Sequence, residues 1–267
     1  MSVAPEPFPT EVLRAVRLGD IGPVEEWLRD HDVNRADGGG FTLLLHAARY
    51  MAICETAKNL IGYLIKRGAD VSQSDNGSWS ALHYVASAHK IPGAIDAARL
   101  LLAAGAPINE QTAATKRTPL GAVVHSLLCS NLSFYIHRES VDFIALLLSN
   151  GAALDGCCAL SGAHSAEAVL LDVVRTSNLP GGSHWQVDDM ASLQFRSVDD
   201  KARCLEVQAL FARTRRLRDR YTLLRMRSLV LRGRATTTDE VMKFLVLRAN
   251  HLVSKVYAFL PAQLGVK

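Results

Sequence analysis

The sequence predicts an all-α repeat protein, and two observations carry this prediction. The segment Gly68-Ala69-Asp70-Val71 recurs as Gly105-Ala106-Pro107-Ile108 and as Gly151-Ala152-Ala153-Leu154, at spacings of 37 and 46 residues. Three similar segments begin at Thr42, Ser80 and Thr118, each 38 residues after the last. Repeats of this length are typical of solenoids, in which a single helical unit cannot bury its apolar face alone.

The recurring residues are those that begin and end helices. Thr or Ser at the start of each segment accepts a hydrogen bond from a backbone N–H that the helix leaves unpaired, and Pro119 is tolerated at the next position. The glycines at 68, 105 and 151 are expected to take the left-handed conformation that ends the second helix of a unit. The longest insertion, residues 129–139, is predicted as lengthened helices in preference to a binding loop.

This pattern resembles the ankyrin repeat, whose signature is T-P-L-H-x-A followed by an apolar helix and L-L-x-x-G-A-D-V-N. Residues 64–71, 101–106 and 147–152 carry the second half of that signature, and His83 falls at its histidine. The resemblance implies an ankyrin-repeat solenoid of paired antiparallel helices with finger turns. It also implies a non-enzymatic role, in which the finger and concave surface binds a protein.

The chain is predicted to have three parts. Residues 7–176 hold an N-terminal cap, about three recognisable repeats and a degenerate one. Residues 177–198 contain Pro180-Gly181-Gly182 and are expected to be a loop or linker. Residues 199–267 follow a helical pattern, with Gly233 ending the first helix. We expect these helices to close the C-terminal end of the solenoid.

Composition and motifs exclude several other classes of protein. The 267 residues are 49% hydrophobic with a net charge of +4, which indicates a globular chain and gives no support for nucleic-acid binding. No phosphate loop, nucleophile elbow or paired histidines occur, and no two of the five cysteines have two-residue spacing. We therefore expect no enzymatic activity, no cofactor and no metal. His83 is expected to bond backbone at a turn.

The sequence shows neither a secretory signal nor an apolar run of the ~20 residues that span a bilayer. We expect a cytoplasmic protein, with the nucleus as the alternative, and no contact with a membrane.

The candidate partner-binding residues lie beside the helix caps. Phe41, Trp79 and Arg117 each precede a cap, where the resemblance places variable, solvent-facing finger residues. Large aromatic side chains and arginine are enriched in interface hot spots. The alternative is that each ring packs on the neighbouring finger. The residues expected to flank the same concave side are Arg35, Tyr84, Lys116 and His89, with Asp75, Asn76 and Lys90. We expect a monomer that binds a protein partner.

A basic run follows the repeats. Residues 199–234 contain eleven Lys or Arg against four acids. Its densest part is a candidate basic patch for an acidic partner or nucleic acid: Arg213, Arg215, Arg216, Arg218 and Arg220. Only Tyr221 could serve as an aromatic platform within it, so nucleic acid is the less favoured partner.

The chain ends in an apolar helical pattern over residues 247–260. Val256-Tyr257-Ala258-Phe259-Leu260 is similar to the F-box-like tails of some ankyrin proteins, although Ala249-Asn250 stands where those tails carry Leu-Pro. That similarity implies an alternative function as a substrate adaptor of a ubiquitin ligase. A helix that caps the solenoid is the favoured interpretation.

Overall fold

The computed structural model describes residues 6–51, 56–128, 133–134, 136–154, 194–195 and 198–231. The chain divides into two compact units, Met1–Phe211 and Ala212–Lys267. Three predictions lie outside the described residues: the degenerate repeat up to residue 176, nearly all of the linker 177–198, and the tail beyond residue 231.

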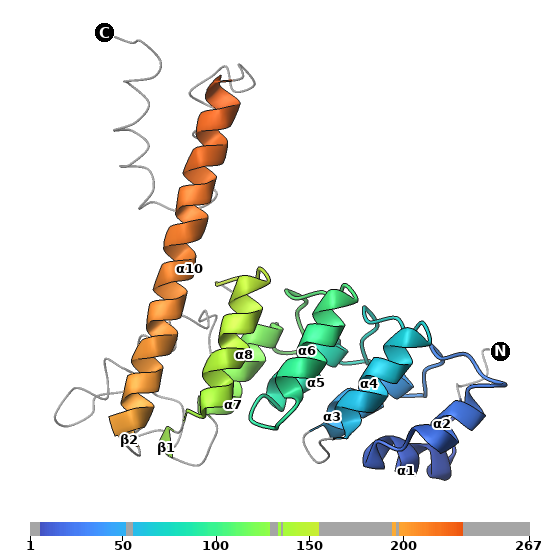
Figure 1. Ribbon diagram of the computed structural model, residues 1–267. Helices are drawn as coiled ribbons and strands as arrows, with labels where there is room; N and C mark the ends of the chain where they lie inside the picture. The colour runs from blue at the N-terminus through green and yellow to red at the C-terminus, as the bar shows by residue number, and fades with distance from the viewer. Residues whose placement is uncertain are drawn as a thin grey trace, which may run out of the picture. The chain divides into compact units, whose positions relative to one another are not determined.

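The described part of the first unit contains four helix pairs. They are α1 (Thr10–Leu18) with α2 (Ile21–Trp27), α3 (Leu43–Tyr50) with α4 (Ala57–Lys66), α5 (Ala81–Ser87) with α6 (Ala94–Ala103), and α7 (Pro119–Leu128) with α8 (Arg138–Ser149). The first helices contact one another in the order α1, α3, α5, α7, and the second helices in the order α4, α6, α8. Figure 1 shows successive pairs side by side. The predicted all-α solenoid is confirmed.

Hydrogen bonds at the helix starts explain why Thr and Ser recur. The Oγ atoms of Thr42 and Thr118 each accept a bond from the N–H three residues further on, at 3.3 and 3.1 Å. The N–H of Ser80 donates to Nδ1 of His83 at 3.2 Å, and Nε2 of His83 lies 3.0 Å from the carbonyl of Arg117. The predicted backbone role of His83 is confirmed, and it ties one unit to the next.

Left-handed glycines end the second helices, as predicted. Gly68, Gly105 and Gly151 have φ of 90°, 91° and 97°. A Cβ added at any of them would meet no atom within 4 Å. The backbone conformation therefore requires glycine here, and crowding does not.

Two asparagines join successive turns. Oδ1 of Asn34 accepts from the N–H of Asp70 at 2.7 Å, and Oδ1 of Asn109 accepts from the N–H of Ala153 at the same distance. The equivalent position in the unit between them is Ser72, and the residue that would donate to it is Pro107. Because proline has no N–H, an asparagine at position 72 would lack this bond.

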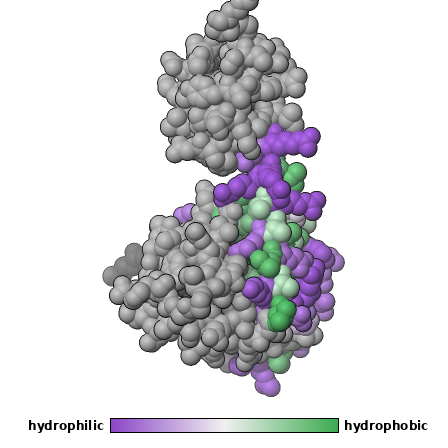
Figure 2. All heavy atoms as spheres, turned by 90° about the vertical axis from the view of Figure 1, so that its left-hand side faces the viewer, coloured by the Kyte–Doolittle hydropathy of each residue, from purple (hydrophilic) through white to green (hydrophobic). Residues whose placement is uncertain are grey.

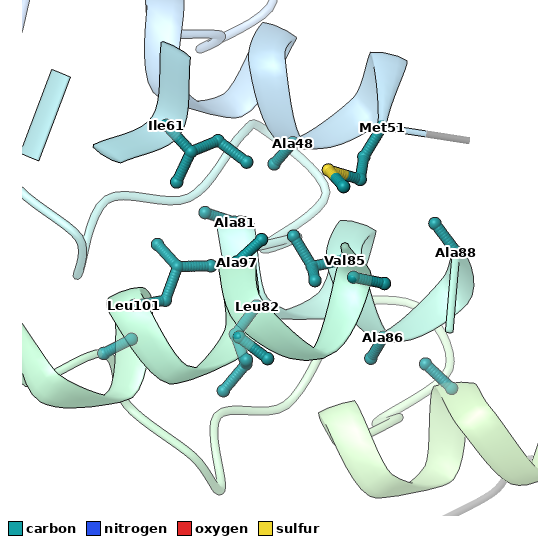
Figure 3. Close-up of a cluster of buried hydrophobic side chains, with 14 of the residues drawn as sticks. Ala48, Met51, Ile61, Ala81, Leu82, Val85, Ala86, Ala88, Ala97 and Leu101 are labelled. Carbon is teal, nitrogen blue, oxygen red and sulfur yellow. The ribbon is translucent and has the colours of Figure 1, made fainter. Parts of the chain in front are cut away.

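Small residues allow the layers to approach. Figure 3 shows Ala48 and Met51 from the α3 side facing Ala81 and Val85 of α5, with Ile61 of α4 beside them. All five side chains are fully buried. Burying a side chain the size of Val85 contributes ~1.5–3 kcal/mol, so this interface is a main source of stability.

The insertion at 129–139 differs from the prediction of lengthened helices. Helix α7 ends at Leu128 and α8 begins at Arg138, and between them Ser133–Phe134 form strand β1. It pairs in parallel with strand β2, Gln194–Phe195. This strand completes its hydrogen bonds with a chain segment about 60 residues further on. Helices α7 and α8, of 10 and 12 residues, are nevertheless longer than α5 and α6, of 7 and 10 residues, so the prediction of lengthened helices holds only in part.

Helix α10 (Val198–Leu231) starts one residue before the position that the sequence predicts. Its first turns pack against the last helix pair. Oδ1 of Asp200 accepts from the N–H of Ile136 at 3.0 Å, and Arg203 donates to the carbonyl of Ile136 at 2.9 Å. Asp200 thus bonds a residue outside its own helix. Within the described ranges no helix is long and apolar enough to cross a membrane.

Candidate protein-binding surface

Two of the finger turns are built around an aspartate. Oδ1 of Asp37 accepts from the N–H groups of Gly39 and Phe41, at 2.8 and 3.0 Å. Its Oδ2 lies 3.1 Å from Nε2 of His46. The carboxylate therefore fixes both the turn and the residue that precedes the Thr42 cap.

The next finger repeats this arrangement 38 residues later. Oδ1 of Asp75 accepts from the N–H groups of Gly77 and Trp79, at 2.8 and 3.0 Å, and Oδ2 accepts from the hydroxyl of Tyr84. A backbone hydrogen bond joins the two fingers, in which the N–H of Asn76 donates to the carbonyl of Gly39 at 3.1 Å. Phe41 and Trp79 are consequently held at fixed, equivalent positions.

The rings on these fingers form a continuous aromatic row. Phe41 stacks on His46, with centroids 5.0 Å apart, and lies 6.0 Å from Tyr84 of the next unit. Tyr84 lies 5.4 Å from Trp79. Towards the N-terminus the row continues from His46 to Phe8 and Trp27. We define the aromatic row by these members: Trp27, Phe8, His46, Phe41, Tyr84 and Trp79.

Arginines lie over the row at three places. The guanidinium of Arg35 lies 5.4 Å from the ring centre of Phe8 and 5.6 Å from that of Trp27. Arg49 lies 5.2 Å from Phe41, and Arg117 lies 6.0 Å from Trp79. A cation over an aromatic face is attracted by the ring quadrupole. The row thus carries positive charge at both ends and near its middle.

The anchoring bonds persist at neutral pH. Burial lowers the pKa of His46 below its ordinary value, against the opposing effect of Asp37, so the ring is neutral. Burial, and then the bond to Asp75, raises the pKa of Tyr84 above its ordinary value, so the phenol keeps its proton. Each carboxylate already accepts three bonds, which leaves the arginines as the available charges on the row.

The third finger has a different construction. Ala113 stands where the first two fingers have aspartate, and Oγ1 of Thr112 accepts from the N–H of Arg117 at 3.0 Å. Lys116 is exposed and has a positive φ of 52° within this turn. No contact between Lys116 and the aromatic row occurs among the described residues.

The structure brings together five of the sequence-predicted partner-binding residues: Arg35, Phe41, Tyr84, Trp79 and Arg117. Their exposure differs from the prediction of solvent-facing tips. Phe41 and Trp79 are half-buried because each ring packs on a neighbouring side chain, and Arg117 is only 9% exposed. Both alternatives raised by the sequence therefore apply in part, since the rings pack on each other and still keep an exposed edge.

His89 is not on this surface, and its predicted placement is wrong. It is fully buried in the turn after α5, with Nδ1 2.9 Å from the carbonyl of Ala86 and its ring against Phe143. Burial lowers its pKa to about 4. A neutral ring in this position completes the core between two units.

Sequence reasoning missed several members of the surface. Trp27, Phe8, Arg49 and Asp37 are not among the residues predicted from the sequence. One signal was available. The pattern Asp-x-Gly-x-aromatic occurs at 37–41 and again at 75–79, at the same spacing of 38 residues as the caps. A repeated aspartate in a glycine-containing turn indicates a side chain that bonds its own backbone.

The predicted basic patch lies on α10. Arg213, Arg215, Arg216 and Arg220 are exposed, and Arg218 is partly so. Leu217 and Tyr221, one helical turn apart, are 56% and 68% exposed among them. Figure 2 views the side on which Figure 1 draws α10 and shows hydrophobic residues next to strongly hydrophilic ones.

Helix pairs stacked in two layers, with finger turns along one edge, define a helical-repeat solenoid of the kind that presents an extended binding surface. Residues 12–112 match the family model of ankyrin repeats in three copies. Residues 12–112 therefore form ankyrin repeats. Ankyrin repeats are generally protein–protein interaction modules and are typically non-enzymatic. No curated protein matches the chain.

Proposed function

We propose that this chain is a non-enzymatic protein-binding module that presents the aromatic row and its arginines to a protein partner. The observation that carries the proposal is the continuity of the row across three units, on turns fixed by Asp37 and Asp75. Side chains that are already ordered lose little conformational entropy on docking. Half-buried aromatic rings beside arginine also have the composition of interface hot spots.

Affinity capture from a lysate of the source organism tests the proposal. The baits are the full chain, a Phe41→Ala/Trp79→Ala variant, and a Leu18→Ala/Leu100→Ala variant as matched control. Leu18 and Leu100 are exposed on outer helix positions, so the control also removes two large apolar side chains. A prey retained by the control and lost by the row variant, with both variants folded, supports the proposal. Equal retention by all three baits would contradict it.

The basic patch on α10 supports a second candidate function, the binding of an acidic partner. Exposed arginines surround the exposed pair Leu217 and Tyr221, so this part of α10 presents positive charge together with two apolar side chains. Charge-neutral Arg213→Gln/Arg216→Gln/Arg220→Gln chains should lose this binding. A steep fall in affinity with salt for a DNA duplex would favour nucleic acid instead.

We also propose that the protein is a monomer and lies in the cytoplasm. Light scattering would test the oligomeric state, and localisation of a tagged chain would test the compartment.

The alternative function as a ubiquitin-ligase adaptor rests on residues 237–267, which lie outside the described residues. Retention of a ligase component by the full chain, and its loss from a chain ending at Ala235, would favour that alternative.

A further inference from the structure

The third finger holds a buried positive charge. Arg117 is 9% exposed, and its Nε has no hydrogen-bond partner among the residues that the structure describes. Across the described part of the chain, its guanidinium takes part in none of the ion pairs. A buried charge without an anionic partner is costly, so native proteins rarely retain one without a function for it.

The described groups around Arg117 do not neutralise it. On one side lies the ring of Trp79, 6.0 Å from the guanidinium carbon. His83 and His125 also face it, and both have pKa values lowered by burial and, to a lesser extent, by the charge of Arg117. Neither acidic group of the adjoining fingers forms an ion pair with Arg117 among the described residues. Asp75 accepts three bonds within its own finger. Glu110 bonds Ser74 and Ser80, and its Oε2 has no hydrogen-bond partner there.

The chemistry of the Arg117 guanidinium indicates which ligand would bind there. Its planar set of N–H donors matches a carboxylate in a bidentate arrangement, and such a pair is strengthened where water is excluded. Trp79 beside it offers an apolar wall for the methylene groups of the same side chain. A nucleic-acid backbone is a poorer fit, because it engages several spaced cations and this site presents one recessed cation.

We propose that Arg117 and Trp79 form a pocket that accepts a glutamate or aspartate side chain of the protein partner, next to apolar residues that lie along the aromatic row. This inference rests on the proposed function and deepens it. Row-dependent binding defines the surface, and Arg117 defines a preference for one acidic residue at one end of it.

Selection from a randomised 12-residue peptide library displayed on phage tests the pocket without a known partner. The immobilised proteins are the full chain, Arg117→Met, the Phe41→Ala/Trp79→Ala variant, and Arg99→Met as matched control. Arg99 is an exposed arginine on α6 whose ion pair is also exposed. We expect Asp or Glu to be enriched severalfold at one position by the full chain and by Arg99→Met. Arg117→Met should keep the apolar preference and lose the acidic one.

A second measurement does not depend on whether Arg117→Met folds. One selected peptide is synthesised with its acidic residue and with the neutral amide, and both are titrated against the full chain. The amide should bind about tenfold more weakly, a difference of about 1.4 kcal/mol, because it replaces a charge-assisted hydrogen bond to the guanidinium by a neutral one.

The outcomes separate the two proposals. Row-dependent peptides without an acidic preference, or equal affinity of the acid and amide peptides, would overturn the pocket and leave the docking surface. Peptides indifferent to Phe41→Ala/Trp79→Ala would overturn the docking surface itself. Arg117-dependent binding of a single-stranded DNA 20-mer, in competition with the peptide, would assign the pocket to nucleic acid and overturn the carboxylate ligand.

Discussion

The turns of the first two fingers are fixed by different residues from those that fix the turn of the third finger. In the first two, one aspartate accepts two backbone bonds and a third from the side chain nine residues later, His46 or Tyr84. In the third, Thr112 fixes the turn and the corresponding later residue is Ala122, which has no donor. The aspartates of the first two fingers thus have their hydrogen bonds completed within the finger, although Nδ1 of His46 has no partner among the described residues. The third finger leaves Arg117 without an ion pair among the described residues.

This difference gives the residues of the protein-binding surface two roles, one in rigidity and shape and one in selectivity. Side chains whose hydrogen bonds are complete contribute shape and apolar area, and they hold the aromatic row rigid. A recessed charge with incomplete bonding contributes selectivity, because a partner lacking the matching group leaves it unpaired. The comparison predicts that substitution of the aspartate that fixes one of the first two fingers changes stability, and that substitution of Arg117 in the third finger changes recognition.

Asp75→Ala should have the largest effect on stability. It removes the acceptor for two N–H groups and for the buried hydroxyl of Tyr84, and we expect the free energy of unfolding to fall by about 3 kcal/mol. Urea denaturation measures the change. Ala113→Asp in the third finger is the control and should give no comparable gain, since Ala122 cannot donate to it. Similar small effects of both substitutions would remove the distinction between the fingers.

Tyr84→Phe should have a smaller effect, because only one of the three bonds to Asp75 is lost. We expect a loss of about 1 kcal/mol, measured by the same urea titration. Tyr50→Phe is the matched control, since Tyr50 is half-buried beside the row and its hydroxyl forms no hydrogen bond to any described residue. If the two substitutions cost the same, the bond to Asp75 does not stabilise the finger.

The pH dependence of stability should distinguish the first finger from the second. An unfolded histidine titrates near pH ~6.5, and burial lowers the pKa of His46 in the folded protein. The unfolded state therefore binds more protons below pH ~6.5, so the contribution of His46 is complete above that pH and is lost as the pH falls towards the folded pKa. Tyr84 does not titrate in this range.

His46→Gln retains a donor for Asp37 and removes the titration. The variant should lose less stability than the wild-type chain between pH 7 and pH 5, measured by urea midpoints at both values. His83 and His89 remain in both chains and also have lowered pKa values, so their shared contribution cancels in the difference. An identical pH dependence of the two chains would show that His46 is not neutral and buried in the folded state.

The sequence predicts the repeats well because their determinants are local. A cap such as Thr42 or a left-handed Gly68 fixes backbone geometry within a few residues, and the repetition makes each signal recognisable. The strand pairing of β1 and β2 depends on a partner segment about 60 residues away, and neither two-residue segment carries a periodic pattern.

The sequence predicts the protein-binding surface only in part, because the burial of its residues depends on contacts between units. Phe41, Trp79 and Arg117 follow from their position beside a cap, but their degree of burial depends on neighbours in other units. His89 illustrates the limit, since its polar side chain in a turn suggested exposure and Phe143 of the last pair covers it. Phe8 joins the row from a segment before the first helix, a contact that no local signal indicates.

Arg117→Met should have the smallest effect on stability and thereby gives the sharpest test of the comparison. The substitution loses a cation–π contact with Trp79, worth ~0.5–1 kcal/mol, and removes an unpaired buried charge while keeping a long apolar side chain. These effects oppose each other, so we expect the urea midpoint to stay nearly unchanged, in contrast to Asp75→Ala. A loss comparable with that of Asp75→Ala would mean that Arg117 is needed to hold the third finger together. A stable chain that has lost its acidic preference would instead show that the residue is retained for recognition, because a side chain that adds nothing to folding has no structural reason to remain charged in the interior.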